Sequence, residues 1–135
     1  MMVLVIDGQG GGIGRALVEK LRARAPEMEI WAVGANAIAT TSMLKAGATQ
    51  AATGENAVCV CVGQADVIAG PVGIVLKDAM RGEITERMAN AVAGAHAQRV
   101  LVPVQRCATY MAGTANQPLQ RLLDDAVENI ILMMK

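Results

Sequence analysis

The stretch "IDGQGGGIGR", residues 6–15, follows the first apolar run of the chain and holds five glycines in seven positions. They are Gly8, Gly10, Gly11, Gly12 and Gly14. Glycine costs conformational entropy in ordered structure, so this density predicts a backbone that turns or approaches another group where a Cβ would not fit.

The flanking residues place this loop between a strand and a helix. Residues 2–6, "MVLVI", form a short continuous apolar run that is typical of a buried parallel strand. Residues 12–25 carry apolar side chains at helical spacing, and Pro26 ends the pattern. A helix that starts after such a loop offers unpaired N–H groups and a positive dipole end to an anion, so we expect the loop to bind a phosphate group.

Strand and helix patterns alternate along the rest of the chain. Further strands are predicted at 28–34, 48–53, 65–70 and 98–104, with a sixth candidate at 108–113. Helices are predicted at 37–46, 54–65, 72–95 with a break near Gly82, and from Pro118 to the end. Residues 54–65 also show the apolar alternation of a strand. A strand there would leave almost no crossover connection before the strand predicted at 65–70, so the helix is favoured. The alternation predicts a single domain, residues 1–135, with an α/β, three-layer, doubly wound and mostly parallel sheet of five to six strands.

Composition narrows the class of function. The 135 residues are 53% hydrophobic and carry a formal net charge of zero, with one Trp, one Tyr and no Phe. Nucleic-acid binding is disfavoured because neither a basic surface nor stacking aromatics are present. No apolar run has the length of a membrane span. The opening run "MMVLVID" is too short for a signal peptide and meets an acid at once, so none is expected. We therefore expect a cytoplasmic protein that binds no membrane.

The glycine spacing carries a resemblance. Gly8, Gly12 and Gly14 fit G-x-x-x-G-x-G, whereas G-x-G-x-x-G fails because Ile13 occupies its last glycine position. The stretch "DGQGGGIGRAL" resembles the nucleotide-binding loop of short-chain dehydrogenases, which implies a Rossmann-like fold. "ADVIAGPVG", residues 65–73, takes the place of that family's strand-four segment. Hydride transfer by that family's mechanism is not supported, because Tyr110 is followed by Thr114 where a Lys is needed.

The whole chain resembles a family of short, single-domain bacterial proteins catalogued as a domain of unknown function. The matching stretches are "IDGQGGGIG", "NAIATTSMLKAGA", "ATGENA", "GPVGI", "GEIT" and "LVPVQRC". This resemblance implies a Rossmann-like fold and supplies no activity.

The residues at the end of the second predicted strand indicate which dinucleotide the site prefers. NAD-binding domains place an acid there for the ribose 2′-hydroxyl, and NADP-binding domains a basic residue. Here the strand ends at Gly34, Ala35 and Asn36, so neither residue type is present. Asn36 either hydrogen-bonds a ribose or caps the next helix, and capping is favoured. NAD or NADP is the expected cofactor, with a flavin or a mononucleotide also compatible.

Several residues beyond the glycines are expected at the same edge of the sheet. "TGEN" follows the third strand and "GPVG" the fourth; each is either a wall of the nucleotide site or an ordinary turn or cap. Arg15 either pairs with a phosphate or lies on a solvated helix face. The predicted cofactor-binding set is Gly8, Gln9, Gly10, Gly11, Gly12, Ile13, Gly14, Arg15, Asn36, Thr53, Gly54, Glu55, Asn56, Gly70, Pro71 and Gly73.

Other reactive residues give weaker signals. Asp7, at the entrance of the loop, either accepts hydrogen bonds from loop amides, which is favoured, or holds Mg²⁺ beside a phosphate. Cys59 and Cys61 point to opposite sides of a helix, which disfavours a metal site, so none is predicted. Cys107 and Tyr110 are the only candidates for a redox role, and His96 is expected at the surface.

Three functions fit these observations. The first is a small Rossmann-like protein that binds a dinucleotide and whose reaction, if any, is unknown. The second is a non-enzymatic, nucleotide-responsive sensor or partner subunit. The third is a Mg-dependent enzyme acting on a mononucleotide or phosphate ester through Asp7. The apolar C-terminal helix, which ends "NIILMM", predicts a homodimer.

Overall fold

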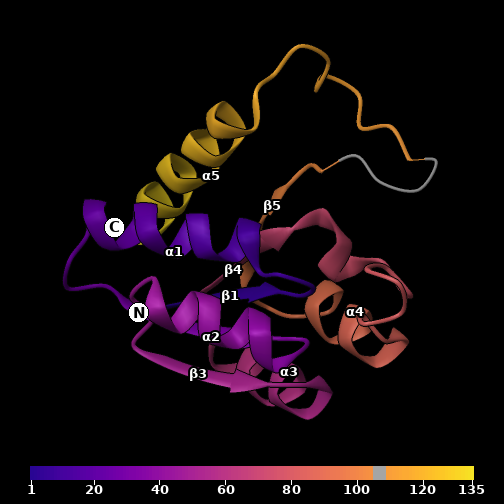
Figure 1. The fold of residues 1–135 in the computed structure, drawn as a ribbon. Coiled ribbons are helices and arrows are strands. Elements are labelled where there is room, and N and C mark those ends of the chain that lie inside the picture. The colour runs from indigo at the N-terminus through magenta and orange to yellow at the C-terminus, as the bar shows by residue number, and fades with distance from the viewer. Residues whose placement is uncertain (105–108) are drawn as a thin grey trace.

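The computed structural model describes residues 1–104 and 109–135. Within these residues the chain forms one sheet, drawn in Figure 1, whose five strands all pair in parallel. The strands are β1 (Met2–Asp7), β2 (Glu29–Gly34), β3 (Gln50–Thr53), β4 (Val67–Pro71) and β5 (Gln98–Val102). Their order is β3-β2-β1-β4-β5, as expected for a doubly wound fold. The predicted α/β class is therefore confirmed.

Helices cover both faces of the sheet. The α-helices are α1 (Gly12–Arg24), α2 (Ala37–Lys45), α3 (Glu55–Cys61), α4 (Glu86–Ala93) and α5 (Leu119–Met133), with 3-10 turns η1 (Val62–Gln64) and η2 (Val72–Val75). One apolar cluster joins α1, α2 and α5 to the sheet, and a second joins α3, η2 and α4 to the other face. The three predicted layers are thus present.

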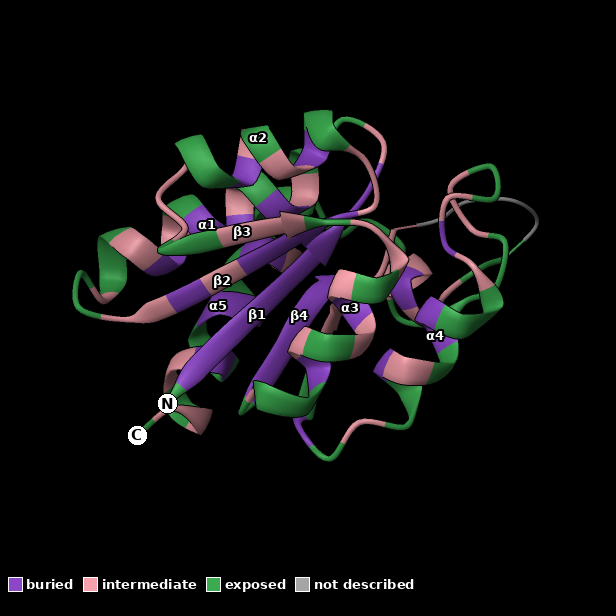
Figure 2. Ribbon diagram, turned by 90° about the horizontal axis from the view of Figure 1, so that it is seen from below, coloured by how far each residue is buried: buried purple, intermediate pink, exposed green. Residues whose placement is uncertain are grey.

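β1 forms the centre of both clusters. Val3 and Val5 belong to the cluster under α1, α2 and α5, whereas Leu4 and Ile6 belong to the cluster on the other face. Successive strand side chains point to opposite faces, and burying each large aliphatic side chain contributes about 1.5–3 kcal/mol. β1 and β4 are drawn as buried along their length in Figure 2. The strand that leads into the glycine-rich loop is therefore held firmly on both sides.

The helix predicted over 72–95 is wrong for most of its length. Only α4 is α-helical there; η2 precedes it, and residues 76–84 form a run of turns, named here the turn segment. Thr85 starts α4 because its hydroxyl accepts a hydrogen bond from the Met88 N–H at 3.1 Å. Gly82 lies within these turns and adopts φ +90°. Ile84, at the end of the turn segment, is fully buried. Its packing favours the turns over the helix that the apolar pattern of 72–95 predicts.

The other boundaries follow the predictions more closely. Residues 54–65 are helical in α3 and η1, so the alternative strand there is excluded. Thr53 does not cap α3, because Gly54 takes that position. The sixth strand at 108–113 is wrong for its described residues, 109–113, where only an isolated bridge at Thr109 and a turn are found. Within the described residues, no helix is long and apolar enough to cross a membrane.

The apolar C-terminal helix α5 packs mainly on its own core. Leu123, Val127 and Ile130 are buried in the cluster shared with α1, and Figure 1 shows the two helices side by side. Leu119 and Leu132 remain exposed, at opposite ends of α5. The stripe that predicts a homodimer is therefore largely covered within one chain.

Candidate functional site

The glycine-rich loop lies where the strand order of the sheet reverses. The chain runs outward from β1 to β2 and β3, then returns to β4 on the other side of β1. Doubly wound sheets bind ligands beyond the carboxyl ends of their strands at this reversal. The register of β1 and β2 aligns Asp7 with Gly34, and the Ala35 N–H donates to the Asp7 carbonyl at 2.9 Å. The end of β2 therefore lies beside the start of the loop.

Asp7 holds the loop together from the inside. Its two carboxylate oxygens accept hydrogen bonds from the Gly8 and Gly14 N–H groups, each at 2.7 Å, and the residue is 4% exposed. The predicted role as an acceptor for loop amides is confirmed. Among the described residues, no group of three His, Cys, Asp or Glu side chains is placed to hold a metal ion.

Two of the glycines are required by packing or backbone conformation. A Cβ at Gly14 would lie 2.5 Å from Met43 Sδ and 2.9 Å from Asp7 Cβ, so only glycine lets α1 approach β1 and α2 this closely. Gly11 has φ +72°, and a Cβ there would lie 2.9 Å from the Ala39 Cα. These positions shape the loop.

Two other glycines face open space. A Cβ at Gly10 or Gly12 would meet no atom of the described residues, 1–104 and 109–135, within 4 Å. In the part of the chain that the structure describes, the N–H groups of Gly10, Gly12 and Ile13 donate to no protein acceptor. These donors lie at the N-terminus of α1, where the helix dipole favours an anion. The loop therefore presents a cluster of free donors with room above them.

Asn36 is a cap and a bridge. Its Oδ1 accepts a hydrogen bond from the Ala39 N–H at 2.9 Å, which confirms the favoured prediction that it caps α2. Its Nδ2 donates to the Gln9 carbonyl at 2.9 Å and to the Glu83 carboxylate. Both amide hydrogens are thus engaged, and the side chain ties the end of β2 to the glycine-rich loop.

Glu83 is the residue that sequence reasoning missed. Its Oε1 accepts a hydrogen bond from the Gln9 N–H at 2.7 Å, and a Cβ at Gly8 would lie 2.6 Å from the same oxygen. The turn segment carries this carboxylate across the edge of the sheet, so no local spacing connects it with residues 8–9. The sequence carries two signals near it: Gly82, which breaks the predicted helix, and the stretch "GEIT", which contains Glu83 and matches the resembled family.

The "GPVG" and "TGEN" stretches lie at the predicted edge, with mainly structural contacts. Gly70 lets β4 pass β1, since a Cβ there would overlap the Ile6 carbonyl oxygen, and a Cβ at Gly73 would lie 3.3 Å from Ala79 Cβ. Pro71 ends β4. The Thr53 and Thr40 hydroxyls lie 2.7 Å apart.

The remaining candidates are spread over the surface. Glu55 in the first turn of α3 lies 3.5 Å from Arg87, and the Asn56 beside it is exposed. Arg15 pairs with Glu19 at 3.0 Å on an open face of α1. Such exposed pairs contribute about 0.2–1 kcal/mol, so the Arg15 guanidinium can leave its partner at little cost.

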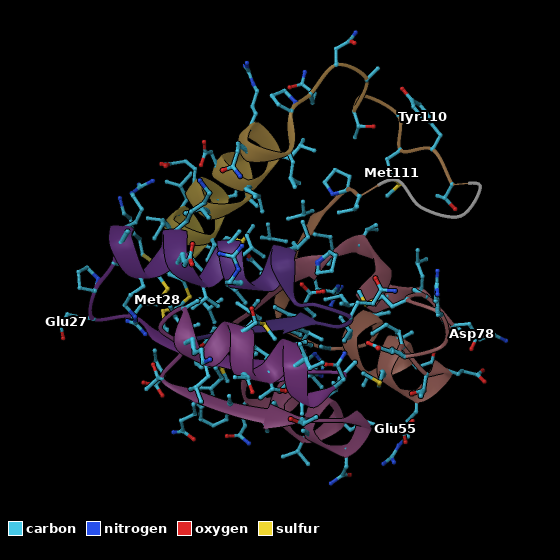
Figure 3. All side chains as sticks on the ribbon, viewed as in Figure 1. Glu27, Met28, Glu55, Asp78, Tyr110 and Met111 are labelled. Carbon is cyan, nitrogen blue, oxygen red and sulfur yellow. The ribbon has the colours of Figure 1, made fainter. Side chains whose placement is uncertain are left out.

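The cysteines and the tyrosine form no centre with the loop in the described residues. Cys59 and Cys61 are free thiols on α3, and burial raises the pKa of the Cys61 thiol, which keeps it protonated. Tyr110 is 62% exposed and lies on the extended segment that leads to α5 (Figure 3). His96 is exposed between α4 and β5. Cys107 lies outside the described residues.

Comparisons with known proteins agree with this architecture. The family model for "Domain of unknown function (DUF3842)" matches residues 2–135. A dodecameric FMN-dependent UbiX-like decarboxylase from Escherichia coli O157:H7 superposes with a TM-score of 0.56 at 16% identity, covering 98% of this chain and 94% of that one. A putative short-chain dehydrogenase/reductase from Aeromonas hydrophila gives 0.47 at 17% identity, covering 99% and 73%. No curated protein sequence matches significantly.

Proposed function

Because the chain belongs to the DUF3842 family, whose function is unknown, we propose from its own site that it binds a dinucleotide of the NAD or NADP class. The diphosphate lies on the glycine-rich loop, against the N–H groups of Gly10, Gly12 and Ile13. Whether a reaction follows is left open by the residues around the loop.

The observation that carries the proposal is the pairing of free donors with free space. The N–H groups of Gly10, Gly12 and Ile13 have no protein acceptor among the described residues, and the two open glycines leave room for an approaching phosphate. Backbone donors at a helix start form charge-assisted hydrogen bonds to phosphate oxygens. The Asp7 carboxylate already accepts hydrogen bonds from two other loop amides.

The same geometry ranks the alternatives. The Mg-dependent enzyme loses its main support, because Asp7 directs both oxygens at the Gly8 and Gly14 N–H groups. A nucleotide-responsive sensor uses the same loop and differs only in lacking turnover. A homodimer is still proposed, and light scattering with and without nucleotide tests it.

A thermal-shift screen tests the binding site. NAD, NADP, FMN, ATP and coenzyme A are compared, each with and without Mg²⁺. A ligand at about 100 times its Kd stabilises the folded state by about 2.7 kcal/mol, which raises Tm by several degrees. We expect NAD or NADP to give the largest shift without Mg²⁺. No shift from any of these ligands sinks the proposal, and a shift from ATP that requires Mg²⁺ favours the third hypothesis.

Gly12→Val tests the position of the phosphate. Its side chain enters open space, so the fold is retained while the phosphate position is filled, and the shift disappears. Gly63→Val is the matched control, because that glycine also has nothing near its Cβ and lies at η1, away from the loop. If Gly12→Val still binds the dinucleotide, the diphosphate does not lie on this loop.

A further inference from the structure

We propose that Glu83 is the acceptor for the adenosine 2′-hydroxyl, so that the site prefers NAD over NADP. This inference rests on the proposed function, because it concerns the ribose of the same dinucleotide. Asn36 is then a positioning residue that orients Glu83. The Glu83 carboxylate, and not Asn36, contacts the ribose.

The end of β2 carries no acid. Nucleotide-binding sheets of this class place an Asp or Glu at the end of the second strand, where its carboxylate accepts the ribose hydroxyl. β2 ends in Gly34 and is followed by Ala35 and Asn36, so the expected carboxylate is absent there. The fold supplies one from elsewhere: Oε1 and Oε2 of Glu83 lie 3.1 and 3.2 Å from Asn36 Nδ2.

The carboxylate also lies against the first glycine of the loop. Oε1 of Glu83 accepts the Gln9 N–H at 2.7 Å, and a Cβ at Gly8 would lie 2.6 Å from that oxygen. The Sδ of Met80, from the same turn segment, would lie 2.7 Å from that Cβ. Glu83 is therefore placed between the start of the glycine-rich loop and the end of β2.

The turn segment holds Glu83 in this position. The Asp78 N–H donates to the Ile84 carbonyl at 2.7 Å, and the Gly82 N–H donates to the Asp78 carbonyl at 3.0 Å. Met80 and Arg81 adopt φ +59° and +57°, a conformation that L residues rarely adopt and that accumulates at functional sites. The fully buried Ile84 anchors the end of the segment in the core.

The carboxylate keeps the capacity to accept one more hydrogen bond. Oε1 is engaged by two donors, the Gln9 N–H and Asn36 Nδ2, whereas Oε2 receives only the longer contact from Asn36 among the described residues. An ionised carboxylate has about four lone-pair sites, so Oε2 is available to a hydroxyl. A 2′-phosphate at the same place meets a like charge, which disfavours NADP.

Calorimetric titration of the wild-type protein tests this without any substitution. The ligands are NAD, NADP and the NAD analogue that lacks the adenosine 2′-hydroxyl. Removing a hydrogen bond to a charged group weakens binding by about ten-fold or more. We expect NAD to bind about ten-fold tighter than both of the other ligands.

Glu83→Gln then assigns the effect to one side chain. The NAD/NADP affinity ratio and the NAD/2′-deoxy affinity ratio should both fall toward one. The negative charge is lost, and the amide oxygen that remains is engaged by the Gln9 N–H and Asn36 Nδ2. Asp78→Asn is the matched control: it removes one charge from the same segment, asparagine tolerates its φ of +68°, and Figure 3 shows its side chain directed outward. Both ratios should be unchanged in this control.

Four results overturn the inference. Equal affinity for NAD and its 2′-deoxy analogue shows that no acceptor is used, although the proposed function stands. Tighter binding of both dinucleotides by Glu83→Gln shows instead that the carboxylate competes with the ligand. Absence of any dinucleotide binding removes the proposed function and this inference with it. NAD preferences that persist unchanged in Glu83→Gln also overturn the inference, because another group is then the acceptor. If the variant does not fold, equal wild-type affinities still overturn it.

Discussion

The glycine-rich loop and the turn segment meet over Gly8, yet they reach their conformations in different ways. The loop has glycine where a neighbour is too close, and an internal carboxylate, Asp7, ties its two ends together. The turn segment places Asp78, Met80 and Arg81 at positive φ, where a glycine is easier. The conformation of the glycine-rich loop can therefore be predicted from its local sequence pattern. The conformation of the turn segment depends on the residues that it packs against.

This difference separates two kinds of carboxylate. Asp7 is buried in its own loop and both oxygens accept backbone N–H groups. Glu83 is partly exposed and comes from a distant segment to an edge where ligands bind. The first is expected to act on stability, and the second on binding.

Gly14→Val should have the largest effect on stability. The new side chain would overlap Met43 and Asp7, and overpacking of this kind costs about 3 kcal/mol of unfolding free energy. Urea unfolding measures the loss. Gly12→Val, whose Cβ meets no atom of the described residues within 4 Å, should lose less than about 1 kcal/mol. Equal losses at the two positions would contradict the division of the loop into closed and open glycines.

Asp7→Ala should come next. It leaves the Gly8 and Gly14 N–H groups without their acceptor in a buried place, at a cost of about 2 kcal/mol. Glu83→Ala should cost about 1 kcal/mol, because water reaches the Gln9 N–H more easily. Chemical unfolding of both variants under one condition compares them. A larger loss for Glu83→Ala would make it the structural carboxylate.

Arg81→Gly should have the smallest effect and the opposite sign. Glycine removes the Cβ penalty of about 1–2 kcal/mol at φ +57°. Glycine also loses more conformational entropy on folding, which offsets part of this gain. The free energy of unfolding should therefore rise by about 0.5 kcal/mol. Arg15→Gly, on the exposed face of α1, should lower stability by about 1 kcal/mol. Thermal unfolding distinguishes the two signs, and a loss at Arg81 would show that its side chain stabilises the turn.

The elements with a strong periodic pattern could be predicted from the sequence. The apolar run of β1, the glycines before α1 and the cap at Asn36 each depend on neighbours within a few residues. The turn segment could not be predicted in this way, because its residues are compatible with a helix and only the burial of Ile84 and the cap at Thr85 select the turns. Helical propensity is a weak preference that tertiary packing overrides.

The candidate site also has a part that the local sequence predicts and a part that it does not. By itself, the sequence determined the α/β fold and a glycine-rich loop at the start of the first helix, since strand and helix periods and glycine spacing are local properties. The sequence also favoured Asp7 as an acceptor for the loop amides, and the structure confirms it. Only the tertiary structure decided that Glu83 stands at the end of β2. Residues 83 and 36 meet because β2 and β4 end at one edge of the sheet and the turn segment after β4 returns Glu83 to that edge. No spacing along the chain encodes that meeting.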